Sequence, residues 1–168
     1  IKGSLYAAFI VGMLEAFVHY STFGRDEITG FARLNEDHLF ISSHNGLFIF
    51  NTRLNQIGEH GRIMVNEIVY RILRDDMNNC LWIGTSTKLL RLDFDKPDLV
   101  HNALPDDILP QGAIRVLTTD ASNNLWFAIR ERLYCLPYGE SWVCEINPVL
   151  LGDKAILSST NTMVNGEQ

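Results

Sequence analysis

Residues 80–93 read CLWIGTSTKLLRLD, and this stretch contains two short apolar runs separated by polar residues. The first run is aromatic and apolar, and the polar residues between the runs are Ser86–Lys88. In the second run, Leu89–Asp93, charged and apolar side chains alternate. A period of two places alternate side chains on opposite faces of a β-sheet. The stretch therefore predicts two antiparallel strands joined by a tight turn.

Three other stretches align with residues 80–93 without a gap, and they begin at Ser4, His38 and Asn124. The four copies start 34, 42 and 44 residues apart along the chain. The second column is always leucine and the third is always aromatic, as in Leu5-Tyr6, Leu39-Phe40, Leu81-Trp82 and Leu125-Trp126. Self-similarity at a period of this size indicates a repeat architecture.

Two further stretches flank each copy of the repeat. An apolar stretch precedes the three full copies, at Ile28–Leu34, Ile68–Leu73 and Ile114–Leu117. A more polar stretch follows each copy, at His19–Phe23, Asn55–His60, Asp98–His101 and Ser141–Ile146. Four antiparallel strands in roughly 40–45 residues are typical of a propeller blade. The sequence thus predicts an all-β fold, a β-propeller with about four four-stranded antiparallel blades.

The expected blades span about 1–24, 25–61, 62–104 and 105–148, and a partial blade or closing strand occupies 149–168. Two arrangements remain open. Either the chain is a segment of a larger ring, which we favour, or a last strand at Lys154–Ser158 closes a four-bladed ring. An open ring would leave unpaired strand edges, which tend to pair with other chains.

Composition excludes several classes of protein. The chain has 168 residues, 46% of them apolar, which suffices for one domain with a real core. A net charge of −6 argues against a nucleic-acid or anionic-membrane binder, because phosphate groups require a basic surface. The apolar run Leu5–Val18 contains Glu15 and is too short to span a membrane, so we expect it in the core.

The loops between the second and third strands of the blades contain the candidate binding residues. In a propeller such loops gather on one face, where they can form a site for an anionic or sugar ligand through charge-assisted hydrogen bonds. The alternative is a set of solvated turn charges, which contribute little energy. The candidates are His44, Asn45, Lys88, Arg130, Glu131 and Arg132.

Nothing in the sequence predicts a cofactor, a metal site or a catalytic triad. The five histidines lack the spacing of a ligand motif, and His44 is the only one well placed on the expected funnel face. Asp37, Asp76 and Asp120 recur before the leucine–aromatic pair, and we expect them to cap turns. We expect Trp82 and Trp126 to pack between blades and Trp142 to be partly exposed.

The three cysteines are too few for a disulfide scaffold. The positions of two of them nevertheless predict which residues pair across a hairpin. If Gly139-Glu140 is a two-residue turn, Cys135 and Cys144 face each other across a hairpin. Such a pair can form a disulfide if it is of the closer, non-hydrogen-bonded type. Two free thiols are the other possibility, and we favour it. Cys80 is expected in the core.

The third copy resembles the two-component regulator propeller repeat, a family in which an Ile-rich strand and an Asp-containing turn precede Leu-Trp-Ile-Gly-Thr. The matching residues are ILRDD at 72–76, LWIGT at 81–85 and LRLD at 90–93. The fourth copy matches through Asp120, NLW at 124–126 and Leu133, whereas the second keeps Asn45-Gly46-Leu47 and the first is the weakest.

This resemblance implies an extracytoplasmic, periplasmic sensor module of a membrane-anchored bacterial receptor with a kinase or diguanylate cyclase output. It also implies a larger ring, commonly of seven blades. The expected partner is a small molecule or oligosaccharide, and a homodimer through propeller surfaces is possible. Two other functions stay open: a lyase of the streptogramin-lyase type, which Asn124–Phe127 resembles, and a purely structural interaction propeller.

Overall fold

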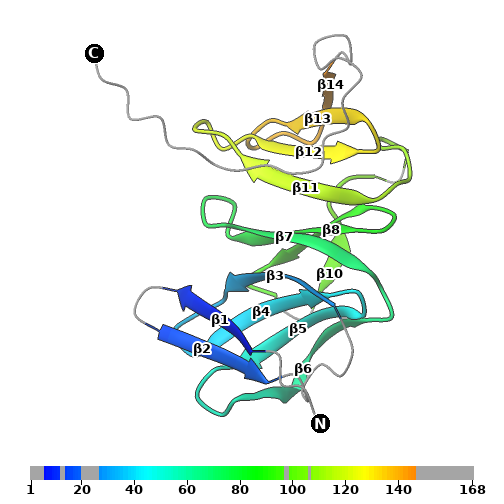
Figure 1. The fold of residues 1–168 in the computed structure, drawn as a ribbon. Helices are drawn as coiled ribbons and strands as arrows, with labels where there is room; N and C mark the ends of the chain where they lie inside the picture. The colour runs from blue at the N-terminus through cyan, green and yellow to red at the C-terminus, as the bar shows by residue number, and fades with distance from the viewer. Residues whose placement is uncertain (1–5, 12–13, 20–26, 97–98, 106, 147–168) are drawn as a thin grey trace.

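The computed structural model describes residues 6–11, 14–19, 27–96, 99–105 and 107–146, and Figure 1 shows their arrangement. Within these ranges the regular structure consists of strands, with no helix. The strands are β1 (Tyr6–Val11), β2 (Leu14–His19), β3 (Ile28–Arg33), β4 (His38–Ser43), β5 (Gly46–Asn51), β6 (Gln56–Val65), β7 (Val69–Asp75), β8 (Cys80–Thr85), β9 (Leu89–Asp93), β10 (Val100–Asn102), β11 (Ile114–Thr119), β12 (Leu125–Ile129), β13 (Arg132–Leu136) and β14 (Cys144–Ile146).

These strands form three four-stranded antiparallel sheets, in which chain order and spatial order agree, and a two-stranded sheet of β1 and β2. We call β3–β6 the second blade, β7–β10 the third and β11–β14 the fourth. The third blade lies between the second and the fourth (Figure 1). The predicted all-β fold with four-stranded antiparallel units is confirmed, whereas the strand expected at Lys154–Ser158 lies outside the described residues.

Adjacent blades contact each other through their first strands, β3 with β7 and β7 with β11. Strand β8 is buried along its whole length because blades cover both of its faces. Leu81 and Ile83 pack in the cluster shared with the second blade, and Cys80 and Trp82 pack in the cluster shared with the fourth. The two-residue period of a strand thus sorts its side chains between two interblade cores.

The tryptophans occupy three different environments. Trp82 is buried between the third and fourth blades, as predicted. Trp126 is half-buried, and Trp142 is 49% exposed, which confirms the expectation for that residue.

An aspartate in the turn before the second strand holds the tryptophan indole of that strand. In the third blade the carboxylate of Asp75 accepts hydrogen bonds from the backbone nitrogens of Met77 and Asn78 and the side-chain amide of Asn78. It also accepts one from Nε1 of Trp82 at 2.9 Å. Asp75 is almost fully buried, and burial tends to raise its pKa, but the hydrogen bonds of Asn78 and Trp82 outweigh this and lower the pKa.

The fourth blade repeats this arrangement with Asp120. Its carboxylate accepts hydrogen bonds from the backbone nitrogens of Ser122 and Asn124, and from Nε1 of Trp126 at 2.8 Å. The prediction that Asp120 caps its turn is therefore confirmed.

The corresponding predictions for Asp76 and Asp37 are wrong. Asp75 caps the turn of the third blade, whereas Asp76 is exposed and pairs with Arg74. In the second blade the Oδ1 atom of Asn35 accepts the hydrogen bond from the backbone nitrogen of Asp37, whose carboxylate pairs with Arg53. In both turns the capping side chain comes from a residue earlier than the predicted one: Asp75 instead of Asp76, and Asn35 instead of Asp37.

Outer strands are present where polar stretches predict them, but their bounds differ. Strand β6 spans Gln56–Val65 and extends five residues beyond the expected His60. It curves through two register shifts against β5, which a short polar pattern does not predict. Of the expected outer strand His19–Phe23, only His19 is among the described residues.

Cys135 and Cys144 are cross-strand partners, as the predicted register requires, and both thiols are free. The tight turn lies one residue earlier than expected, because the backbone nitrogen of Glu140 donates to the carbonyl of Pro137. Gly139 has a φ of +77° and supplies the left-handed conformation that this turn needs. Cys80 is fully buried, and burial raises the pKa of its thiol to about 12.

The packing of the third blade on the fourth predicts that Gly84→Ala destabilises the chain. A Cβ atom at this position would lie 2.5 Å from the carbonyl oxygen of Ile114. The two blades would have to separate, and overpacking of this kind costs about 1–3 kcal/mol. Urea denaturation measures the loss. Gly58→Ala, where a Cβ would meet nothing within 4 Å, is the control and is expected to unfold like the original chain.

The hydrogen bonds that the Asp75 carboxylate accepts from its turn and from Trp82 predict that Asp75→Asn loses stability, and that the loss depends on pH. The substitution weakens hydrogen bonds to a buried charged acceptor, with an expected loss of about 1.5–3 kcal/mol at neutral pH. The lowered pKa means that the carboxylate stabilises the fold above the unfolded-state pKa of about 3.9. This contribution disappears as the pH falls through the folded-state pKa, so the two proteins should converge in stability in acid. Denaturation between pH 7 and pH 2.5 tests this. Asp76→Asn is the control, because the exposed Asp76 pairs with Arg74 and does not cap the turn, and it should lose less stability at neutral pH than Asp75→Asn.

Candidate ligand-binding site

The candidate site is built by the connection between the third and fourth blades, residues 103–113. The equivalent connection between the second and third blades, residues 66–68, has only three residues. Two hydrogen bonds attach the long connection to the third blade: the backbone nitrogen of Ala103 donates to the carbonyl of Leu89, and that of Gly112 donates to the carbonyl of Thr87, both at 3.1 Å.

A cavity of about 330 Å³ lies under this connection. Its walls come from the turn before β9, the end of β10, the connection itself and the end of β12. The lining residues are Thr87, Lys88, Leu89, Asn102, Leu104, Pro105, Leu109, Pro110, Gln111 and Ile129. This volume falls in the range of small-molecule sites in proteins.

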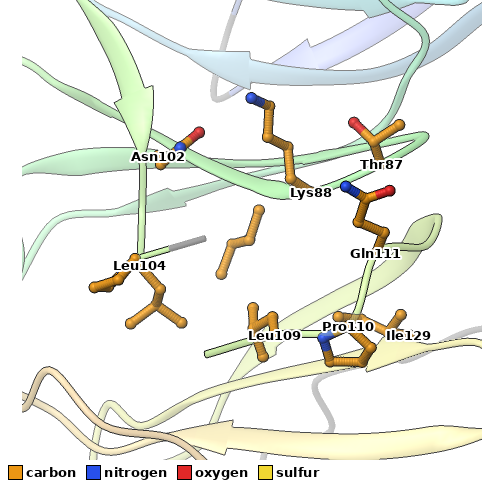
Figure 2. Close-up of a pocket in the computed structure, with 10 residues that line it drawn as sticks. Thr87, Lys88, Asn102, Leu104, Leu109, Pro110, Gln111 and Ile129 are labelled. Carbon is orange, nitrogen blue, oxygen red and sulfur yellow. The ribbon is translucent and has the colours of Figure 1, made fainter. Parts of the chain in front are cut away.

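The cavity has a polar end and an apolar end. Figure 2 shows the polar groups of Lys88, Thr87 and Gln111 on the side of the third blade. Leu109, Pro110 and Ile129 lie on the side of the fourth blade in the same view. Ile129 belongs to the core cluster between these two blades, so the apolar end is continuous with that core.

The only charged residue of the lining is cationic, Lys88. Its ammonium group forms no ion pair with any residue in the described part of the chain. Arg130 lies near Gly112, the neighbour of the lining residue Gln111, since a Cβ atom on Gly112 would lie 3.6 Å from its Nε. The lining itself therefore carries one positive charge, although the chain carries a net charge of −6.

The structure brings together only part of the predicted set. Lys88 lines the cavity and Arg130 is adjacent to it, whereas Arg132 pairs with Glu145 on the outermost strand at 2.8 Å. Glu131 is an exposed residue of the β12–β13 turn and does not line the cavity.

His44 and Asn45 lie on the second blade, outside the cavity lining. The His44 ring is edge-on to the ring of Tyr70, with centroids 5.7 Å apart, and its Nδ1 is 3.5 Å from Oε2 of Glu27. Any ligand role of these two residues stays a prediction, and it would be separate from the cavity.

Sequence reasoning missed a series of interblade links at β-bulges. Each first strand skips one residue in its pairing with the second, at Thr29, Tyr70 and Arg115. Thr29 donates to the carbonyl of Val69 in the next blade at 2.6 Å, and the guanidinium of Arg115 lies 4.5 Å from the centre of the Tyr70 ring. Bulges re-aim side chains, and here they direct them to the neighbouring blade.

The described residues contain no group of three or more His, Cys, Asp or Glu side chains that can hold a metal ion. In the same part of the chain, no helix has the length and apolarity needed to cross a membrane.

Comparison with known proteins shows a likeness in structure but not in sequence. No protein-family model matches the chain, and neither does any curated protein. The extracellular domain assigned to the one-component system BT4673 of B. thetaiotaomicron matches 93% of this chain, with a TM-score of 0.66 and 16% identity. The sheets are propeller blades.

Two other structures from the same organism support this fold. One is described as the extracellular domain of the hybrid two-component system BT4673, with a TM-score of 0.62, 16% identity and 86% of this chain covered. The other is the extracellular domain of the hybrid two-component system BT3049, with a TM-score of 0.55, 17% identity and 82% of this chain covered. The propeller chain described here spans 19–21% of the length of these three proteins.

The anchoring of the long connection predicts the effect of Gly112→Ala. The added Cβ would lie 2.7 Å from Cγ2 of the buried Ile129, so this end of the connection must move away from the fourth blade. We expect faster hydrogen–deuterium exchange in the peptide that covers 103–113 and unchanged exchange in β4 and β5. Gly58→Ala is the control, and equal exchange in all three proteins would contradict the proposed anchoring.

Proposed function

We propose that this chain is a non-catalytic, extracytoplasmic ligand-sensing module of a membrane-anchored bacterial signal-transduction receptor. The observation that carries the proposal is the cavity between the third and fourth blades, whose walls come from both blades and from the connection between them. The likeness to extracellular domains of two-component systems supports the same role. The output domain is a kinase or a diguanylate cyclase in this proposal.

The position of the cavity supplies a way to transmit binding. A ligand that contacts both blades favours one relative arrangement of those blades over others. Such a shift requires only that the ligand bind the two arrangements with different affinity. The hydrogen bonds of Ala103 and Gly112 tie the connection to the third blade, so movement of the connection is coupled to the turn before β9.

The chemistry of the lining supports binding rather than catalysis. None of its ten residues is a histidine, a cysteine or a carboxylate, so the lining offers Lys88 as its one titratable group. Acid–base catalysis of a lyase reaction uses groups that exchange protons near neutral pH. No observation in the described part of the chain favours the lyase of the streptogramin-lyase type.

The proposal predicts that a small ligand stabilises the chain against heat and that filling the cavity abolishes this effect. The test is a thermal-shift panel of oligosaccharides, amino acids and alkyl or aryl carboxylates. A ligand present at a hundred times its Kd adds about 2.7 kcal/mol of stability. We expect at least one class to raise the Tm of the original chain and not that of Leu109→Trp, which occupies the cavity.

Lys96→Gln is the matched control, because the exposed Lys96 lies outside the cavity lining, and its response should equal that of the original chain. If no class in the panel shifts the Tm, or if Leu109→Trp responds like the original chain, the cavity is not the sensing site.

A further inference from the structure

We infer that the cavity between the third and fourth blades takes a carboxylate with an apolar body, of the alkyl or aryl carboxylate class. This inference rests on the proposed ligand-sensing function and names the ligand class for the same cavity. It follows from three features of the lining: the sign of the charge, the available hydrogen-bond donors and the nature of the apolar surface.

The sign of the charge selects an anionic ligand. Lys88 is the single charged residue of the lining, and the guanidinium of Arg130 lies near Gly112, which follows the lining residue Gln111 in the chain. Neither cation forms an ion pair within the described part of the chain. A cationic ligand would meet repulsion here with no carboxylate in the lining to offset it.

The donors at the polar end fit a carboxylate. In Figure 2 the side chains of Lys88, Thr87 and Gln111 lie on the third-blade side of the cavity, and the nitrogen of Lys88 is directed away from Gln111. A carboxylate accepts hydrogen bonds on both of its oxygens, and bonds between ionised partners are roughly twice as strong as neutral ones. A carboxylate at this end of the cavity can therefore accept a charge-assisted hydrogen bond from Lys88, the one cation of the lining.

The other end of the cavity fits an aliphatic or compact aryl body. Leu104, Leu109, Pro110 and Ile129 contribute branched and cyclic aliphatic surface. A sugar ring would have its hydroxyl groups against this surface without hydrogen-bond partners, and each polar group buried in this way lowers affinity. The lining also contains no aromatic side chain on which a sugar ring could stack.

Isothermal titration calorimetry of the 168-residue chain with octanoate tests the inference, with octylamine, 1-octanol and acetate as comparison ligands. We expect octanoate to bind more tightly than the other three, because only octanoate has both the anionic group and the apolar chain. Lys88→Gln should weaken octanoate binding roughly tenfold to a hundredfold. Lys88→Glu and Leu109→Trp should abolish it.

Lys96→Gln is the matched control, since Lys96 is an exposed lysine that does not line the cavity. This variant should bind octanoate like the original chain, and Tm values equal to that of the original chain show that all variants fold. Unchanged octanoate affinity in Lys88→Gln and Lys88→Glu, or equal binding of octylamine, would overturn the inference.

The outcomes also separate the ligand class from the proposed function. If octanoate does not bind but an oligosaccharide of the thermal-shift panel does, and Leu109→Trp blocks it, the carboxylate inference fails and the sensing function stands. If nothing in the panel and none of the four titrated ligands binds, both fail.

Discussion

The close approach of the third blade to β11, the first strand of the fourth blade, is the constraint on which the candidate site depends. The backbone of β8 at Gly84 lies so near Ile114 that even a Cβ atom has no room. Sheets that meet closely at the first strand and diverge toward the outer strands leave a wedge between them. Here the connection 103–113 and the side chains of Leu89, Leu104 and Ile129 line the space that remains, and the cavity is the part that they do not fill.

Within each blade a second constraint holds the turn before the second strand. The carboxylate of Asp75 and that of Asp120 each accept hydrogen bonds from backbone nitrogens of the turn and from the indole nitrogen of a tryptophan. Buried donors without acceptors are costly, so this arrangement allows an indole N–H to enter the interblade core. It also explains why the tryptophan and the aspartate recur together in the third and fourth copies of the repeat.

Sequence reasoning predicted the strands well, because burial on both faces and strand periodicity leave local signals. The strands expected from residues 80–93 are β8 and β9, and Cys135 pairs with Cys144 as expected although the turn lies one residue earlier than predicted. Three features lacked a local signal. The bulges at Thr29, Tyr70 and Arg115 depend on pairing between strands, and the shift from Asp76 to Asp75 depends on the hydrogen bond to Trp82.

The third feature is the site itself. The sequence placed candidate residues on the loops between second and third strands, and the cavity uses one of these, Lys88. The rest of its lining comes largely from the long connection, which has no periodicity and so gave no signal beyond its length and its two prolines, Pro105 and Pro110. Convergence of residues from three separate segments is a property of the packed blades.

A crystal structure of the chain with octanoate would show whether the space between the third and fourth blades is a ligand site. We expect electron density for one octanoate in the cavity, with its carboxylate within hydrogen-bond distance of Nζ of Lys88 and its alkyl chain against Leu109 and Ile129. Density for octanoate only at another surface, or an empty cavity at saturating octanoate, would contradict this expectation.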